Sequence, residues 1–476
     1  MPRSLQRNVL VAGGVVVLLA LVVLTAPRLV RLDRYRSRLE AAASAVLGMD
    51  VRVGGRLGLR LLPGVRVTLE DARILDAHGV AVATARRTRL WVEPLPLLRG
   101  EFRLRRVELF QPRFALERDA GGRWNVEGLE AGAKHFGVLD GASVALSDGT
   151  LHYADRRSGE GFEAAGLELN VSRLRLGGGN GPRRWKDLSL RAQLSCREIR
   201  TKDFSVSALK ATVVGKEGTF ELGPVTMRIF GGPATGRLRA DLAGPVPAFR
   251  VRCALSRFHV EEFLRTLSPK PSAEGAMDFS ASLSMQGGTR SQLVRTAAGE
   301  LSLRGENLTL VGNDLDGALS RFESSQNFNL VDVGAVFFAG PVGLAGTRGI
   351  SFANVLRGSG GHSDVRILVS DWKVERGVAR AQDVAMATSR SRIALQGGLD
   401  FVHGRFVDVT VAAVDARGCV RVRQAVHGSF EKPVVEKPRV LASLGGPVLK
   451  LVKRLRDLLP AGPCEAFYSG SVAPPK

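Results

Sequence analysis

The side chains able to do chemistry are few and scattered along the 476 residues of the chain. The seven histidines are His78, His135, His152, His259, His362, His403 and His427. None lies in an H-x-x-x-H or H-E-x-x-H motif, and no G-x-S-x-G nucleophile elbow occurs. Asp and Glu occur singly, and sequence alone does not show which carboxylates meet in space. We therefore expect no catalytic residues, no metal site, no cofactor and no enzymatic activity.

Glycines and cysteines give no stronger signal for chemistry. The glycine-rich run at 177–182 is not followed by the Lys-Ser or Lys-Thr pair of a P-loop, so it is predicted to be a loop. The four cysteines, Cys196, Cys253, Cys419 and Cys464, are far apart and form no C-x-x-C pair. Their spacing excludes thioredoxin-type and zinc-type sites, and it fits either free buried thiols or one or two disulfides.

The charge balance is strongly basic, with a formal net charge of +22 and a pI near 10.9. The basic residues are mostly arginines that alternate with apolar residues, as in residues 51–53 and 102–105. There is no compact basic tract and no nucleic-acid-binding motif. The pattern excludes nucleic acid as the expected partner and favours affinity for anionic lipid surfaces.

A membrane anchor is expected within residues 1–27, because residues 8–27 contain no charge and are almost wholly aliphatic. Twenty residues of helix span the roughly 30 Å apolar core of a bilayer. Representative anchor residues are Val9, Val15, Leu18, Leu21 and Leu24. A cleaved signal peptide is the alternative, but Pro27 and the residues before it make a poor cleavage site. Arginines on both sides leave the orientation open at this point.

Residues 28–48 are expected to form an amphipathic juxtamembrane helix that Gly48 ends. Its apolar face, at spacings of three and four, is Leu32, Tyr35, Leu39, Ala42, Ala43 and Val46. The opposite face is rich in arginine, so the helix could lie on the bilayer surface or pack against the body of the protein.

From Val51 onward the apolar period changes to two, and glycine turns separate strand after strand. Short helices are expected at 259–267 and 315–323. A basic amphipathic helix near 447–459 could cap the sheet or lie on a membrane. The predicted fold is mostly β: an N-terminal transmembrane helix, then a long, curved, mainly antiparallel β-sheet groove with a few short amphipathic helices.

Alternating strands have one apolar face that must be buried against a second sheet, inside a barrel or around an apolar ligand. The monotony of small aliphatic residues favours a groove for acyl chains. The groove candidates are Leu57, Leu59, Leu61, Val65, Val67, Leu69, Phe102, Leu104, Leu188, Leu190, Leu238, Leu242, Leu301 and Leu303.

An ordered series of runs follows the anchor and helix, at 59–65, 94–101, 107–112, 118–119 and 122–125. Further runs lie at 327–330, 371–374, 383–385, 397–401 and 464–472. Together they resemble the AsmA family of Gram-negative envelope proteins. The expected regions are an AsmA-like N-terminal β domain at 49–130, a repetitive β-sheet body at 131–310 that resembles the family in style only, and an AsmA-like C-terminal region at 311–476.

The resemblance implies a single-pass inner-membrane protein whose bulk is periplasmic. It also implies kinship with bridge-like lipid transfer proteins and a role in outer-membrane biogenesis, without catalytic residues. Because Cys419 and Cys464 both lie in the family-like C-terminal region, we expect a disulfide between them.

Two functions follow as hypotheses. In the first, the protein conveys or binds phospholipid, or another acyl lipid, along the apolar groove. In the second, it is a non-enzymatic scaffold that assists assembly of outer-membrane proteins, with a filled core. The expected partners are the lipid, the inner membrane and an envelope protein.

Overall fold

The computed structural model describes residues 34, 36–61, 64–99, 103–128, 138–175, 188–266, 273–312, 314–317, 319, 361–437, 439–440 and 464–475. The predicted anchor, Phe102, the glycine-rich run and the helix near 447–459 lie outside these residues. No helix within the described ranges has the length and apolarity to cross a membrane. The chain divides into unit 1, residues 1–225, and unit 2, residues 226–476, and each is described by itself.

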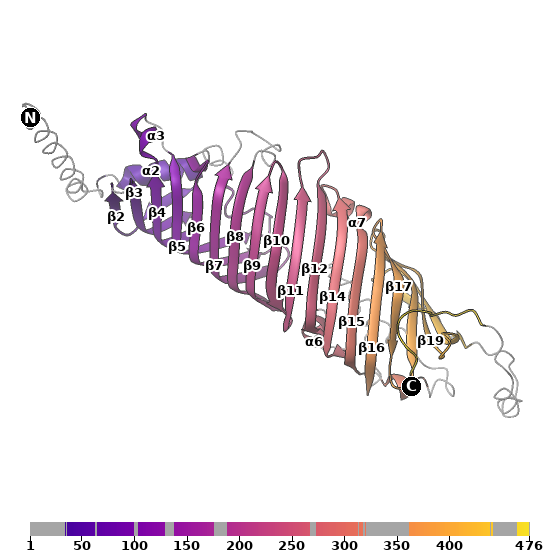
Figure 1. The fold of residues 1–476 in the computed structure, drawn as a ribbon. Coiled ribbons are helices and arrows are strands. Elements are labelled where there is room, and N and C mark those ends of the chain that lie inside the picture. The colour runs from indigo at the N-terminus through magenta and orange to yellow at the C-terminus, as the bar shows by residue number, and fades with distance from the viewer. Residues whose placement is uncertain are drawn as a thin grey trace, which may run out of the picture. The chain divides into compact units, whose positions relative to one another are not determined.

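Unit 1 consists of long strands with two short helices (Figure 1). Its elements are α2 (Arg36–Leu47), β1 (Asp50–Val53), β2 (Leu57–Arg60), β3 (Arg66–Leu75), β4 (Ala81–Val92), α3 (Pro94–Leu98), β5 (Leu104–Arg118), β6 (Ser143–Asp155), β7 (Glu160–Arg175), β8 (Ser189–Thr201) and β9 (Ser205–Lys216). Strand β10 (Thr219–Ile229) contains the point of division.

The strands of unit 1 pair in chain order. Strands β1 and β2 lie end to end against β3, and each later strand through β9 pairs with the one before it. All these pairs are antiparallel except β5 and β6, which are parallel. Parallel neighbours require a connection that returns along the strands, and residues 119–142 separate β5 from β6 in the sequence.

One residue near the middle of each strand of unit 1 from β3 to β9 interrupts the pairing. Strand β3 pairs with β4 at Glu70 and at Ala72, so that Asp71 is skipped. The skipped residues form a line across the sheet, which we name the kink line: Asp71, Arg86, Gln111, Asp148, Gly166, Arg197 and Ala208.

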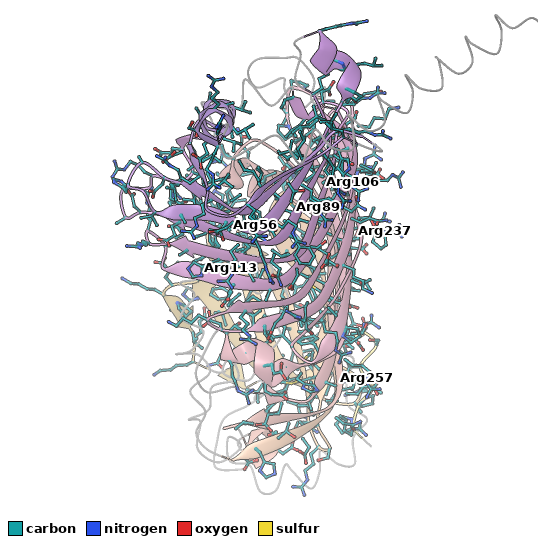
Figure 2. The ribbon with its side chains drawn as sticks, turned by 90° about the vertical axis from the view of Figure 1, so that its left-hand side faces the viewer. Arg56, Arg89, Arg106, Arg113, Arg237 and Arg257 are labelled. Atoms are coloured by element: carbon teal, nitrogen blue, oxygen red, sulfur yellow. A yellow bond between two sulfur atoms is a disulfide. The ribbon has the colours of Figure 1, made fainter. Side chains whose placement is uncertain are left out.

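Backbone conformation and side chains both mark the kink line. Asp71, Gln111, Asp148 and Ala208 have left-handed φ angles of 51°, 48°, 51° and 53°. The Arg86 guanidinium donates to Gln111 Oε1 at 3.1 Å, and Gln111 Nε2 donates to Asp148 at 3.0 Å. Each strand gains one residue at the kink line. On one side of this residue the apolar positions therefore have odd numbers, and on the other side they have even numbers, or the reverse. The strands also bend (Figure 2).

Unit 2 is also a sheet with few helices. Its elements are β11 (Gly232–Asp241), β12 (Ala248–His259), α6 (Val260–Arg265), β13 (Ala273–Glu274), β14 (Ala276–Gln286), α7 (Arg290–Thr296), β15 (Ala298–Val311), β16 (His362–Glu375), β17 (Val378–Ala387), β18 (Arg392–Asp400), β19 (Arg405–Val414), β20 (Val420–Gly428), β21 (Pro433–Val435) and β22 (Arg439–Val440). From β11 to β22 the pairings are antiparallel.

The main hydrophobic core belongs to unit 2. Its largest fully buried side chains include Trp372, Leu368, Met386, Ile393 and Leu399. All nine of the largest fully buried side chains among the described residues lie in this unit, and none lies in unit 1. Unit 2 therefore has a packed interior of the usual kind.

Residues 464–475, which we name the C-terminal strap, cover the second face of the sheet in unit 2. Tyr468 and Val472 pack on small residues of β17, β18 and β19, including Ala385, Ala394 and Ala412. Tyr468 Oη donates to Asp383 at 2.6 Å, and the backbone and hydroxyl of Ser471 donate to the same carboxylate. The strap buries the outer face of strands that are already buried on their inner face.

The predicted mostly β, mainly antiparallel fold with few short helices is confirmed. Of the helix expected at 28–48, residues 36–47 form α2, whereas residues 28–33 and 35 lie outside the described residues. The helix expected at 259–267 is α6. Of the helix expected at 315–323, residues 315–317 and 319 are described and are helical. The division between units falls inside the expected repetitive body at 131–310, and the expected boundaries remain predictions.

Candidate functional site

An apolar cavity of about 660 Å³ lies between α2 and the sheet of unit 1. The helix contributes Leu39, Ala42, Ala43, Val46 and Leu47. The sheet contributes Val51, Val67, Leu69, Ala72, Ile74, Ala83, Thr84, Ala85, Thr88, Leu90, Leu104, Val107, Leu109, Pro112 and Phe114, and the β5–β6 connection contributes Val138 and Leu139. Two threonines are the only polar residues in this described lining, and none of it is charged.

Helix α2 is held over the sheet by polar contacts with the edge strand β1. Arg36 donates to the carbonyl oxygens of Val53 and Gly55 at 2.8 and 2.9 Å. Glu40 accepts from the Val53 N–H at 2.8 Å, and the Ser44 hydroxyl accepts from the Val51 N–H at 2.9 Å. These contacts satisfy backbone groups that an edge strand otherwise leaves to solvent.

The polar contacts position α2 without sealing the cavity. No side chain of α2 is fully buried, and Leu39 remains 38% exposed. The helix turns its apolar face, predicted from spacings of three and four, toward the apolar face of the sheet. Of the two positions considered for this helix, the structure shows it packed on the body, as one wall of a partly open cavity.

Two rows of side chains, all apolar except Thr88, run from the cavity across strands β2 to β9 of unit 1. Directly paired positions define them. The first apolar row is Leu57, Leu69, Thr88, Leu109, Leu146, Leu169, Leu194 and Ala211. The second apolar row is Leu59, Val67, Leu90, Val107, Val144, Val171, Ala192 and Val213. The face that lines the cavity therefore continues beyond it, strand by strand, to β9.

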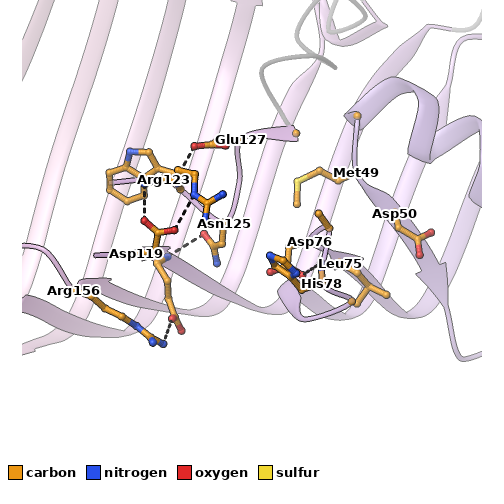
Figure 3. A pocket seen from close by; sticks show the side chains of 16 residues that line it. Met49, Asp50, Leu75, Asp76, His78, Asp119, Arg123, Asn125, Glu127 and Arg156 are labelled. Carbon is orange, nitrogen blue, oxygen red and sulfur yellow. Dashed lines mark hydrogen bonds and ion pairs between the residues drawn. The ribbon is translucent and has the colours of Figure 1, made fainter. Parts of the chain in front are cut away.

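A second pocket, of about 810 Å³ and polar, lies at the end of the strands where β3 turns into β4 (Figure 3). Its carboxylates are engaged with neighbours: Asp119 with Arg123 at 3.0 Å and Glu117 with Arg156 at 2.9 Å. Hydrogen bonds from the backbone and side chain of Arg123 lower the pKa of Asp119. These pairs hold turns in place, and they do not form an acid–base constellation.

The structure brings part of the predicted groove together. Val67, Leu69 and Leu104 line the cavity, and Leu57 and Leu59 pair directly with Leu69 and Val67. Leu61 and Val65 are half-buried near the turn that joins β2 to β3. Farther along unit 1, Leu190 is half-buried in β8 and Leu188 is half-buried just before it.

The candidates in unit 2 have different surroundings. Leu238 and Leu242 are half-buried in and just after β11. Leu301 and Leu303 are 4% and 3% exposed, and they belong to the packed core of unit 2. Their side chains are covered by protein and offer no apolar surface to a ligand.

Several cavity residues were absent from the predicted groove, namely the helix residues and Leu90, Val107, Leu109 and Phe114. Each belonged to a periodic apolar pattern in the sequence. The missing information was the pairing register, which decides which strands present their apolar residues at the same level.

Cys419 and Cys464, the pair expected to be joined, form a disulfide that fastens the C-terminal strap to unit 2. Cys196 is buried and Cys253 half-buried, and both are free thiols whose pKa burial raises. A disulfide is typical of an oxidising compartment outside the cytoplasm. Within the described part of the chain, no group of three or more His, Cys, Asp or Glu residues could hold a metal ion.

The AsmA family model matches residues 1–180 and 180–327 of the chain. The match includes α2, the cavity and both apolar rows, and it also covers the middle segment whose resemblance was expected in style only. No curated protein matches the chain. Since the family model covers well over half of the 476 residues, the chain belongs to the AsmA family.

Proposed function

We propose that this protein is a membrane-anchored protein of cell-envelope biogenesis that binds phospholipid and conveys it along the apolar face of unit 1. The observation that carries the proposal is the cavity between α2 and strands β3, β4 and β5, with its uncharged, almost wholly aliphatic lining. Its volume of about 660 Å³ is in the ordinary range for ligand sites of roughly 300–1,000 Å³.

An acyl chain is the ligand that this lining favours. Burying a methylene group is worth about 0.8 kcal/mol, so a long chain gains much energy without any specific polar contact. A charged headgroup would lose its hydration inside such a lining and gains more by staying in solvent. The partly open roof at Leu39 allows that arrangement.

The apolar rows support conveyance in addition to binding. A closed pocket ends at its walls, but these rows continue across β6, β7, β8 and β9 with an aliphatic side chain at each pairing. A lipid tail can therefore exchange one apolar neighbour for the next without crossing a polar step.

The setting of the proposal is the inner membrane, with the bulk of the chain in the periplasm. It is supported by the uncharged stretch at 8–27, by the Cys419–Cys464 disulfide and by family membership. The arginines that follow the apolar stretch are then headgroup contacts and not a signal that keeps the body in the cytoplasm.

Adjacent residues of β5 provide a matched test. Leu109 lines the cavity, whereas Phe110 is 47% exposed. The full chain is purified in mild detergent as wild type, Leu109→Asp and Phe110→Asp, and phospholipid in organic extracts is quantified by mass spectrometry. We expect about one or more phospholipids per wild-type chain, a loss of most of it in Leu109→Asp, and wild-type content in Phe110→Asp.

Equal phospholipid content in Leu109→Asp and Phe110→Asp, with both variants folded by circular dichroism, would contradict the proposal. An unfolded Leu109→Asp is resolved with Leu109→Asn, which keeps a polar group without a charge. The absence of phospholipid from the wild-type chain also counts against binding.

A scaffold for outer-membrane protein assembly is the second candidate, and the packed core of unit 2 favours it. Strands β16 to β19 are covered on both faces, so this region has no apolar surface left for lipid. A pure scaffold predicts that Leu109→Asp supports envelope integrity in cells as well as Phe110→Asp does. A lipid conveyor predicts that only Leu109→Asp fails.

A further inference from the structure

Helix α3 presents the most exposed large apolar side chain of the described residues. Leu95 is 74% exposed in the short Pro94–Leu98 helix between β4 and β5. The segment is held in place, since the Glu93 N–H donates to the Arg103 carbonyl at 3.0 Å and the Arg99 N–H to the Pro96 carbonyl at 2.9 Å. The Leu95 side chain is therefore largely exposed on a segment whose base is closed by a backbone hydrogen bond.

Basic residues lie at the same end of the strands as this exposed leucine. The arginines at the same end of the strands are Arg60, Arg66, Arg99, Arg103, Arg105 and Arg106. The described acidic residues there are Glu93, Asp140 and Glu108, and Glu108 is paired with Arg106 at 2.8 Å and Arg89 at 3.5 Å. Figure 2 labels Arg89 and Arg106 close together on these strands. The net charge of the described residues at this end is therefore positive.

A tryptophan, Trp91, lies between two of these arginines. Arg66, Trp91 and Arg106 are directly paired across β3, β4 and β5. The two guanidinium carbons are 5.7 and 5.6 Å from the centre of the Trp91 ring. Tryptophan, arginine and an exposed leucine are the residue types that settle at the boundary between lipid headgroups and acyl chains.

The pocket at the other end of the same strands is lined by more acidic than basic residues. The polar pocket there is lined by five carboxylates and two arginines: Asp50, Asp76, Glu117, Asp119, Glu127, Arg123 and Arg156. Strand β4 is 12 residues long, so its two ends lie about 40 Å apart. Arginines outnumber carboxylates at the α3 end, whereas at the other end the carboxylates of the pocket and of Asp155 lie beside Arg118 and Arg157. The α3 end is therefore the one that suits an anionic surface.

The direction of α2 relates this polarity to the N-terminal apolar stretch. Arg36 at the start of α2 contacts Val53 and Gly55, whereas Ser44 near its end contacts Val51. The helix therefore runs from the middle of β3 toward the polar pocket, and its first residue lies on the α3 side of its last. The uncharged stretch at 8–27 comes just before this point in the sequence.

We propose that the α3 corner, meaning α3 with the adjoining ends of β2, β3, β4 and β5, docks into the headgroup layer of an anionic bilayer. Leu95 inserts into the interface and the arginines bind lipid phosphates. The occupant is the bilayer that the N-terminal stretch crosses, so the inference rests on the membrane anchoring in the proposed function. It adds a second membrane contact that orients unit 1.

The test measures the depth of Leu95 in the membrane. The full chain, with Cys196→Ser and Cys253→Ser so that the disulfide pair remains, is reconstituted into vesicles of phosphatidylethanolamine and phosphatidylglycerol. An environment-sensitive fluorophore is attached at Leu95→Cys and, as the matched control, at Val80→Cys. Val80 is also an exposed apolar residue, 61% exposed, but it precedes β4 at the acidic end.

We expect spin-labelled lipids to quench the fluorophore at position 95 several-fold more than at position 80. Arg99→Gln should weaken the docked population about fivefold, since one arginine near an anionic surface is worth about 1 kcal/mol. Arg156→Gln at the opposite end should not. Equal quenching at positions 95 and 80, or a fluorophore at 95 that protein shields from lipid and water alike, would overturn the proposal.

The result is independent of phospholipid binding in the cavity. Quenching at position 95 in a chain whose organic extract holds no phospholipid supports docking and contradicts the proposed conveyance. Phospholipid in the extract without quenching at position 95 supports conveyance and contradicts docking.

Discussion

The apolar face of β3–β5 in unit 1 and that of β16–β19 in unit 2 are built from the same kind of alternating sequence, but their surroundings differ. In unit 1 the described residues that face it are those of the 12-residue helix α2 and two residues of the β5–β6 connection, and a cavity of about 660 Å³ lies between them and the sheet. In unit 2 the corresponding side chains, such as Leu368 and Ile393, are completely buried. Alternation therefore predicts that a face is apolar, whereas the covering elements decide whether it becomes a cavity or a core.

The second face of the sheet shows a further difference. In unit 1 the outward residues are arginines and their acidic partners, as at Arg89 and Glu108. In β17–β19 alanines occupy the outward face, so that the C-terminal strap can lie close to the sheet. Both faces of these strands in unit 2 are thus covered by protein. In unit 1 one face is exposed to solvent, and the other is apolar and incompletely covered.

The largest expected effect comes from truncating one leucine in each region. Leu368→Ala should cost about 2–5 kcal/mol, because it opens a void in a packed core. Leu69→Ala should cost about 1 kcal/mol or less, because its side chain is only half-buried beside an existing cavity. Hydrogen exchange of peptides from β16–β17 and from β3–β4 measures both. Similar losses in the two regions would show that the cavity is closed in solution.

The disulfide should contribute the next largest effect. Cys419→Ser should destabilise unit 2 by about 2–4 kcal/mol, because a bridge between residues 45 apart no longer restricts the unfolded chain. Urea unfolding under non-reducing conditions, followed by hydrogen exchange of residues 464–475, measures it. Cys253→Ser, which alters a half-buried free thiol, serves as the control. A strap that keeps its full protection without the bridge would refute this prediction.

Acid should release the strap from the sheet. Burial acts to raise the pKa of Asp383, but hydrogen bonds from Ser471 and Tyr468 outweigh it and leave the pKa below its ordinary value. A lowered folded-state pKa gives stability that is present above the ordinary value near 4 and is lost as the pH falls below it. Protection of residues 464–475 should therefore drop below about pH 4 in the wild type.

Asp383→Asn is the companion variant. It should lose about 1–2 kcal/mol at neutral pH, since hydrogen bonds to a partly exposed charged group become neutral ones. Its strap should then show little pH dependence in the same range. A wild-type strap whose protection is constant from pH 6 to about pH 3 would exclude this role of Asp383.

The smallest effect is expected at the roof of the cavity. Glu40→Ala removes the acceptor for the Val53 N–H and should weaken the docking of α2 by about 0.5–1.5 kcal/mol. Faster exchange of the Val53 amide by NMR or mass spectrometry measures the loss. Glu40→Gln keeps an acceptor oxygen and should retain most of the protection. Unchanged exchange in Glu40→Ala would mean that apolar contacts alone hold the roof.

Sequence was sufficient for the elements that rest on local pattern. The two-residue period predicted the strands around Leu57, Leu69 and Leu190, and the helical spacing of Leu39, Ala43 and Val46 predicted both α2 and its apolar face. Such patterns depend only on which side of a single helix or strand is apolar, and this can be read from the spacing of apolar residues in the sequence.

The sequence alone did not predict the features that depend on strand register or on the elements that cover the sheet. Nothing local distinguishes Leu303, in the packed core, from Val67, in the cavity, since both alternate with polar residues. The kink line was also missed, because left-handed residues such as Gln111 and Ala208 are not of a type that favours this conformation. Both features depend on pairing between strands, which a single strand's pattern does not record.

The two apolar rows of unit 1 bear on how fast a bound molecule could move. Neighbouring strands lie about 4.8 Å apart, so a hydrocarbon chain lying across them meets one aliphatic group at each of these intervals. The row residues of β6 to β9 are all aliphatic, so none of these side chains can hydrogen-bond a ligand and single out its position. Under the proposed function, such a surface would discriminate little between acyl chains of different length and would offer little resistance to their sliding.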